Sequence, residues 1–163
     1  MMNVSGQVVG GEAAIAARSA SFSGPLSRLV SVHGVAEVGM AEFEDFVGGS
    51  GNSLLFFTGD PARYPESLDV AAILPELVKA FPNRFRVGLV RRESEVALQV
   101  KFGFGVWPAL VFLREGGYLG VLTGMRDWDE YLAEIPALLA APVSRPPSLG
   151  VAVHSQASGG CSS

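Results

Sequence analysis

Cysteine is almost absent from this chain of 163 residues, in which the single cysteine, Cys161, lies close to the C-terminus. One cysteine cannot form an intrachain disulfide, a Cys-x-x-Cys pair or a cysteine-rich zinc site. Histidine is scarce as well, because only His33 and His154 are present and they lie far apart in the sequence. We therefore expect no metal site and no other cofactor.

Positive charge and long apolar runs are also lacking. The formal net charge is -4, whereas a general nucleic-acid binder is usually basic. The apolar runs fall short of the ~18 residues that indicate a membrane span. The beginning of the chain has no basic region ahead of its short apolar stretch, so it makes a poor secretory signal. We expect a cytoplasmic protein that neither binds nucleic acid nor inserts into a membrane.

Apolar residues, by contrast, are plentiful: hydrophobic residues make up 48% of the chain and charged residues 17%, which suits a packed core. The length suits one domain with loose ends. Residues 1–24 are rich in Gly, Ala and Ser, and we expect a flexible arm there. Residues 142–163 are rich in Pro, Gly and Ser, and we expect a tail there. The domain then spans residues 25–141.

Within that domain, the apolar periodicity alternates between the periods of strands and helices. The expected strands are 27–34 (or a helical turn there), 53–57, 84–90 and a hairpin over 109–123 that turns at Glu115-Gly116-Gly117. The expected helices are 40–47, 65–81, 94–102 and 127–141. The order βαβαβαββα predicts parallel middle strands and an antiparallel hairpin. We therefore expect an α/β fold, with a central mixed sheet flanked by helices.

Two of these helices carry apolar stripes that we expect to face the core. In the first helix the stripe is Met40, Phe43, Phe46 and Val47, and in the last helix it is Trp128, Leu132, Ile135, Leu138 and Leu139. Asp127 precedes the last helix and is a suitable N-cap. Trp128, one residue later, is expected to be a core residue.

The segment "FGVWPALVFLREGGYLGVLTG", residues 104–124, resembles the part of the thioredoxin fold that contains a cis-proline before the hairpin. Pro75, inside the second long helix, matches the helix-kinking proline of the same fold. The resemblance implies that the Trp107–Pro108 peptide bond is cis. It also implies that the backbone before Pro108 lies at an edge where an extended peptide can bind.

The cysteine pair of the thioredoxin family is missing. Counting back from Pro75, the Cys-x-x-Cys motif falls on Ser67, Leu68, Asp69 and Val70. Disulfide exchange needs an attacking thiolate and a second thiol, so this site cannot catalyse it. We therefore expect that the protein is not an enzyme.

Three longer segments are similar to the HyaE/HupG family of nickel–iron hydrogenase expression proteins, which are thioredoxin-like and lack the cysteine pair. They are "LLFFTGDPARYPESLDVAAILPELVKAF", "RFRVGLVRRESEVALQVKFGFGVWPALVFLREGGYLG" and "GMRDWDEYLAEI". The resemblance implies a non-redox chaperone for hydrogenase maturation. Its partner would be the twin-arginine signal peptide of the hydrogenase small-subunit precursor, bound before export. The arm and the tail lie outside this resemblance.

The residues that we expect to bind the peptide are Asp60, Tyr64, Glu66, Asp69, Trp107 and Pro108. Glu66 and Asp69 share one face in the first turn of a helix, where the helix dipole alone is a sufficient reason for carboxylates. The alternative is that they receive an arginine pair through paired hydrogen bonds. If they do not, the next candidates are Glu42, Glu44 and Asp45 on the first helix.

Basic residues gather elsewhere, and their simplest interpretation is a solvated face, although a patch for an acidic partner is the alternative. They are Lys79, Arg84, Arg86, Arg91, Arg92 and Lys101. Two other functions also stay open: a thioredoxin-like interaction module for another client, and a redox protein that uses Cys161 as a lone thiol. The sequence does not indicate an oligomeric state.

Overall fold

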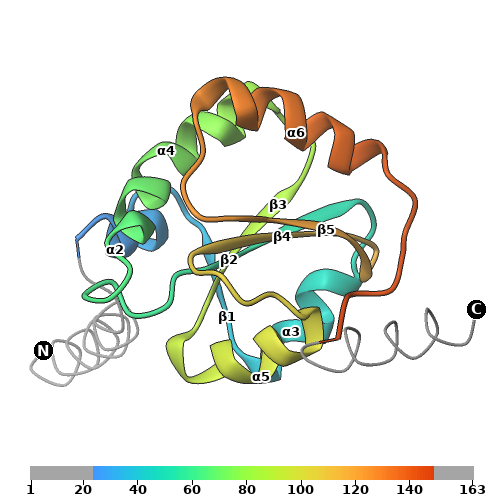
Figure 1. Cartoon of the computed structure of the whole chain (residues 1–163), viewed down its shortest axis with the longest axis horizontal. Helices are drawn as coiled ribbons and strands as arrows, with labels where there is room; N and C mark the ends of the chain where they lie inside the picture. The colour runs from blue at the N-terminus through green and yellow to red at the C-terminus, as the bar shows by residue number, and fades with distance from the viewer. Residues whose placement is uncertain (1–23, 149–163) are drawn as a thin grey trace, which may run out of the picture.

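The computed structural model of the chain describes residues 24–148 (Figure 1), so most of the expected arm, the end of the tail and Cys161 lie outside the described residues. The described residues contain a five-stranded sheet with the strand order β1-β3-β2-β4-β5. The strands are β1 (Ala36–Val38), β2 (Asn52–Phe57), β3 (Arg86–Val90), β4 (Ala109–Arg114) and β5 (Gly117–Thr123).

The sheet is mixed, as predicted. Strands β1, β3 and β2 run parallel to one another, β4 is antiparallel to β2, and β5 is antiparallel to β4. The β4–β5 hairpin turns through two residues, Glu115 and Gly116, whose φ angles of 49° and 85° are both positive. A two-residue turn of this hand matches the right-handed twist of the strands. Gly117, which was expected in the turn, is the first residue of β5.

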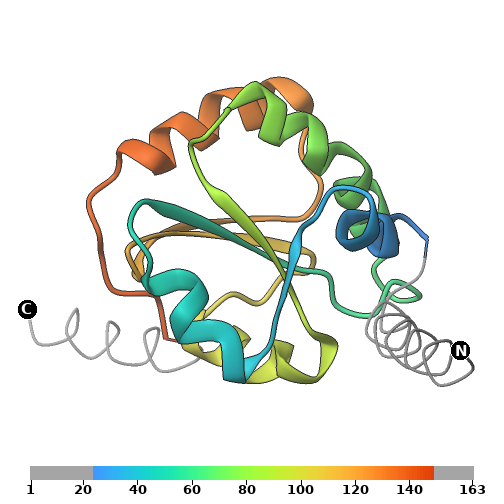
Figure 2. The ribbon, with the colours of Figure 1, turned by 180° about the vertical axis from the view of Figure 1, so that it is seen from behind.

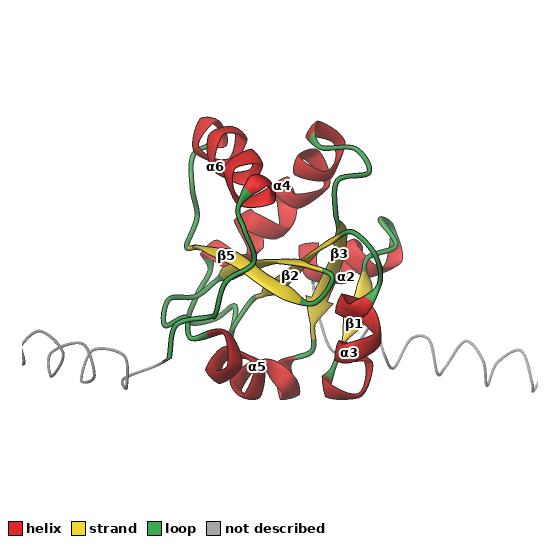
Figure 3. Cartoon of the chain, turned by 90° about the vertical axis from the view of Figure 1, so that its right-hand side faces the viewer, coloured by secondary structure: helices red, strands yellow, loops and turns green. Residues whose placement is uncertain are grey.

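Helices cover both faces of the sheet. They are α2 (Pro25–Ser31), α3 (Met40–Gly48), α4 (Glu66–Ala80), α5 (Glu95–Phe102) and α6 (Trp128–Ala140), and a 3-10 turn, Arg92–Ser94, leads into α5. Helices α2, α4 and α6 pack on one face, and α3 and α5 pack on the other (Figure 3). Seen from behind, α4 and α6 lie above the sheet while α3 and α5 lie below it (Figure 2).

The alternation of side chains along a strand divides the core into two clusters. In β2, Leu54 and Phe56 join the cluster under α2, α4 and α6, whereas Leu55 and Phe57 join the cluster over α3 and α5. All four side chains are fully buried. A continuous apolar run is therefore required in β2, because both of its faces are covered.

The first element differs from the predicted order, which begins with a strand within residues 27–34. Residues Pro25–Ser31 form helix α2, and the first strand, Ala36–Val38, follows it. Leu26 and Leu29 lie three apart, so they share one helical face, and both are buried against the cluster that α4 helps to cover. This packing on α4 decides in favour of the helix.

Three residues of the expected apolar stripes are exposed instead of buried: Met40 by 54%, Trp128 by 39% and Leu132 by 37%. The face of α6 that packs on the sheet is formed by Tyr131, Ile135 and Leu139, which are spaced four residues apart. The Tyr131 hydroxyl accepts a hydrogen bond from the backbone N–H of Arg126. A tyrosine with this partner can take the buried position that was expected for Trp128.

The segment that follows α6 runs along the outer edge of β5. The backbone N–H of Ser144 donates a 2.9 Å hydrogen bond to the carbonyl of Tyr118, and the two residues form an isolated antiparallel bridge. The Val143 side chain lies against Gly117, because a Cβ atom at that glycine would come within 2.5 Å of it. Of the helices in residues 24–148, none is long and apolar enough to cross a membrane.

Candidate functional site

The candidate site lies at the end of the sheet where β2 finishes and β4 begins, on the left side of Figure 1. We call this end of the strands the binding edge. These two strand ends meet because β2 and β4 are antiparallel, with Phe57 opposite Ala109. The Trp107–Pro108 peptide bond, just before β4, is cis. Gly124, just after β5, donates a 2.7 Å hydrogen bond from its N–H to the Pro108 carbonyl. Four separate segments therefore converge here: the β2–α4 loop, the start of α4, the start of β4 and the end of β5.

A pair of aromatic rings forms the centre of this edge. The rings of Tyr64 and Trp107 stack with centroids 6.2 Å apart and an interplanar angle of 29°. Gly59 lies directly against both rings, since a Cβ atom there would be 2.8 Å from the Tyr64 ring and 3.1 Å from the Trp107 ring. Phe57 and Phe104 support Trp107 from the core side, with edge-on contacts. Both stacked side chains are half-buried, so the pair presents a partly exposed apolar surface.

Two of the predicted site residues mainly shape this edge. Pro108 is buried, so its ring is not available to a partner, although its neighbour Trp107 is. The Asp60 carboxylate accepts a 3.0 Å hydrogen bond from the backbone N–H of Ala62. The Asp60 carbonyl also accepts hydrogen bonds from the N–H groups of Arg63 and Tyr64. Asp60 therefore holds the turn that places Tyr64 beside Trp107.

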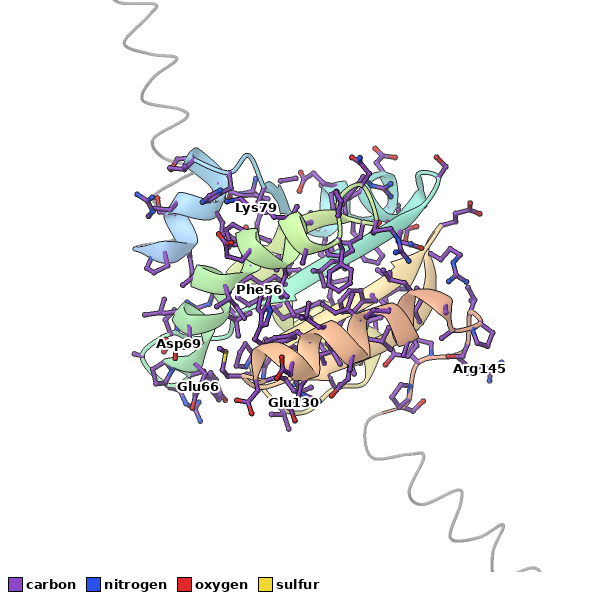
Figure 4. All side chains as sticks on the ribbon, turned by 90° about the horizontal axis from the view of Figure 1, so that it is seen from above. Phe56, Glu66, Asp69, Lys79, Glu130 and Arg145 are labelled. Atoms are coloured by element: carbon purple, nitrogen blue, oxygen red, sulfur yellow. The ribbon has the colours of Figure 1, made fainter. Side chains whose placement is uncertain are left out.

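Glu66 and Asp69 are both exposed in the first turn of α4. Within residues 24–148, neither carboxylate forms an ion pair or a side-chain hydrogen bond. The nearest cation along the chain, Arg63, lies over the Tyr64 ring, with its guanidinium carbon 5.5 Å from the ring centroid. In Figure 4, Glu66 and Asp69 project from the beginning of α4, on the side of the view where α6 also begins. Both carboxylates are therefore free to bind a cationic partner.

Sequence reasoning missed Glu95, a buried carboxylate beneath this edge. One of its oxygens accepts hydrogen bonds from the backbone N–H groups of Thr58 and Gly59, at 2.8 and 3.1 Å. The other oxygen lies 3.4 Å from Nε of Arg92. Burial raises the pKa of the Glu95 carboxyl, and the hydrogen bonds from Gly59 and Thr58 and the Arg92 charge offset this only in part. Glu95 thus ties the first turn of α5 to the residues on which the stacked rings lie.

The start of α6 was also missed, because Trp128 and Leu132 were expected in the core. Met125, Trp128 and Leu132 are exposed there. The N-cap and first turn of α6 add three carboxylates, which are Asp127, Asp129 and Glu130. Glu130 lies at the same end of the helix pair as Glu66 (Figure 4). The apolar spacing in the sequence is compatible with either face of α6, so only the packing of Tyr131 could have revealed this surface.

The positions that correspond to the thioredoxin cysteines do not offer a reactive group. Ser67 is fully buried, and Val70 is 1% exposed. Across the described part of the chain, no three His, Cys, Asp or Glu side chains gather closely enough to hold a metal ion. The arrangement offers exposed carboxylates beside a half-exposed aromatic pair, which suits the binding of a cationic, partly apolar chain.

Comparison with known proteins gives consistent matches. A family model described as "Hydrogenase-1 expression protein HyaE" matches residues 26–131. The "Hydrogenase expression/formation protein HoxO" of Cupriavidus necator is 49% identical over 137 residues, which cover 83% of this chain and 85% of that protein. The "Hydrogenase expression/formation protein HupG" of Bradyrhizobium diazoefficiens is 36% identical over 128 residues, covering 76% of this chain and 86% of that protein. A solved thioredoxin of Plasmodium falciparum shares the fold, with 17% identity, a TM-score of 0.52 and coverage of 62% of this chain and 95% of that one.

Proposed function

The chain belongs to the HyaE family of hydrogenase expression proteins, and from this membership we propose that its acidic edge binds the twin-arginine signal peptide of a hydrogenase small-subunit precursor. In this proposal the protein is a cytoplasmic chaperone that holds the precursor before export. In this proposal it is also not an enzyme, and it cannot catalyse disulfide exchange at this site, because a serine and a valine stand where a thioredoxin carries its two cysteines. The names of its relatives, which concern hydrogenase expression and formation, support a hydrogenase-associated partner.

The observation that carries the proposal is the pair of uncompensated carboxylates, Glu66 and Asp69, beside the Tyr64–Trp107 stack. An arginine guanidinium binds a carboxylate through two parallel hydrogen bonds, which fix its orientation as well as its distance. Two adjacent arginines present two such groups. An aromatic face also attracts a guanidinium, as Arg63 over the Tyr64 ring shows, and a peptide arginine would compete with Arg63 for that ring.

The test is a titration of a labelled hydrogenase small-subunit signal peptide against the wild type and the double variant Glu66→Lys/Asp69→Lys. We expect the variant to bind at least tenfold more weakly, which corresponds to about 1.4 kcal/mol. We also expect the wild-type affinity to fall as salt rises, because exposed charges are screened over about 10 Å at 0.1 M.

The matched control is Glu44→Lys/Asp45→Lys, which makes the same change in charge at two exposed positions of α3. This control should bind the peptide like the wild type. If the control loses affinity while the α4 variant does not, the arginine site lies on α3. If the wild type itself does not bind the signal peptide, the alternative of another client replaces this proposal.

A further inference from the structure

The start of α6 presents a row of exposed apolar side chains that the proposed arginine site does not use. Met125 is 42% exposed, Trp128 39% and Leu132 37%. Trp128 and Leu132 lie four residues apart and so share one face of the helix, about 6 Å apart along its axis at 1.5 Å per residue. Met125 precedes them in the loop that joins β5 to α6, where its sulfur accepts a hydrogen bond from the Tyr131 hydroxyl. We refer to these three residues as the α6 row.

The α6 row begins next to one of the segments that form the candidate site. Gly124, directly before Met125, is hydrogen-bonded to the Pro108 carbonyl, and Pro108 follows Trp107. This 2.7 Å hydrogen bond joins the two segments, because Trp107 directly precedes Pro108 and Met125 directly follows Gly124. The α6 row and the carboxylates of α4 thus lie on helices that cover the same face of the sheet, whereas Trp107 packs with the cluster on the opposite face.

The charges around the α6 row define the partner that fits it. Asp127, Asp129 and Glu130 border the row on α6, and Glu66 and Asp69 begin the neighbouring helix α4. Arg126, two residues before Trp128, forms an ion pair with Glu134, whose two carboxylate oxygens lie 2.8 and 2.9 Å from its Nη1. The surface therefore combines an apolar centre with an anionic border. Its complement is a chain that carries cations next to an apolar run.

We propose that the α6 row binds the apolar segment that follows the arginine pair of the signal peptide, so that one peptide occupies the α4 carboxylates and the α6 row together. This inference rests on the proposed function and adds the second half of its binding surface. The arginines supply orientation at Glu66 and Asp69, and the apolar segment covers Trp128 and Leu132. A peptide with the arginines alone would leave these two side chains exposed to water.

The experiment uses two peptides and three forms of the full chain. One peptide is the intact signal peptide, and in the other the apolar segment is replaced by serines. The proteins are the wild type, Trp128→Ser/Leu132→Ser and the control Val96→Ser/Val100→Ser. The control residues are also four apart on a helix, and they are 67% and 60% exposed on α5, which covers the opposite face of the sheet.

We expect Trp128→Ser/Leu132→Ser to bind the intact peptide about tenfold more weakly than the wild type does, and to bind the serine peptide equally well. The control should bind both peptides as the wild type does. This pattern is a coupling between the α6 row and the apolar segment, which loss of folding cannot produce because it would weaken both peptides. A second variant, Leu132→Ser alone, should give a smaller loss in the same direction.

Unchanged affinity of the α6 variant for the intact peptide would overturn the inference, as would an equal loss for both peptides. The Glu66→Lys/Asp69→Lys variant separates this result from the proposed function, because it should weaken both peptides alike. If that charge reversal acts while the α6 variant does not, the arginine site stands and the α6 row has no part in it. If the wild type binds neither peptide, both proposals fail.

Discussion

The two ends of the sheet use their charged side chains differently. At the end where β2 begins, Arg86 donates hydrogen bonds to the carbonyls of Ser50 and Phe46 and to the Ser53 hydroxyl, at 2.6, 3.1 and 2.8 Å. Arg114 at the same end donates to the carbonyls of Leu139 and Ala141. At the end where β2 finishes, the exposed carboxylates of Glu66 and Asp69 have no such partners among residues 24–148.

This difference separates charges that hold the fold from charges that are available to a partner. The arginines at the first end satisfy carbonyls at the ends of α3 and α6, which have no partner within their own helices. At the second end, the carboxylates of Glu66 and Asp69 do not satisfy any group of the described chain, so their removal should cost little stability. Other carboxylates at this end do hold the fold: Asp60 and Glu130 each accept a hydrogen bond from a backbone N–H, and the buried Glu95 accepts two. Stability and binding should therefore respond to different substitutions.

The largest expected effect on stability comes from Arg86. Arg86→Ala removes three hydrogen bonds and leaves the Phe46 carbonyl and the buried Ser53 hydroxyl without this donor. We expect the free energy of unfolding to fall by about 3 kcal/mol, since buried polar groups without partners cost roughly 1–3 kcal/mol each. Urea denaturation monitored by tryptophan fluorescence measures this loss. The neighbouring Arg84→Ala, at an exposed position, should leave stability nearly unchanged, and an equal loss there would show that the loss does not come from the hydrogen bonds of Arg86.

Glu95 gives the next largest effect. Glu95→Ala leaves the N–H groups of Thr58 and Gly59 unsatisfied, and we expect it to lower the free energy of unfolding by about 2 kcal/mol. Glu95→Gln keeps an oxygen that can accept both hydrogen bonds and removes the buried charge. It should therefore be at least as stable as the wild type at neutral pH, although it loses the ion pair with Arg92.

The pH dependence of stability is a further test of the role of Glu95. Because burial raises the pKa of Glu95, the folded protein binds this proton more tightly than the unfolded chain does. The contribution of Glu95 to stability is thus fully present below the ordinary pKa of 4.5 and is lost as the pH rises through the raised value. Denaturation across this window should show the decline in the wild type and not in Glu95→Gln. A wild-type contribution from Glu95 that grows with pH would contradict this assignment.

The sequence was sufficient for the mixed sheet, apart from its first strand, and for the family. The apolar run at 54–57, the repeated change of period and the Trp107–Pro108 pair are local signals, and together they predicted the mixed sheet and the family. Local signals could not predict which distant groups meet. Glu95 is separated from Thr58 by 37 residues, and Arg86, which was expected on a solvated face, is separated from Ser53 by 33. The exposure of Trp128 was mispredicted for the same reason, because contact with the distant strands of the sheet decided that Tyr131 is buried and Trp128 is not.

An exchange of charge between protein and peptide tests the central claim most directly. The four affinities to measure pair the wild type and Glu66→Lys/Asp69→Lys with the twin-arginine signal peptide and with a peptide that carries two glutamates in place of the arginines. We expect the wild type to prefer the arginine peptide, and the lysine variant to bind the glutamate peptide at least tenfold more tightly than the wild type does, about 1.4 kcal/mol. If the lysine variant keeps the wild-type preference for arginine, the carboxylates of α4 do not receive the arginine pair.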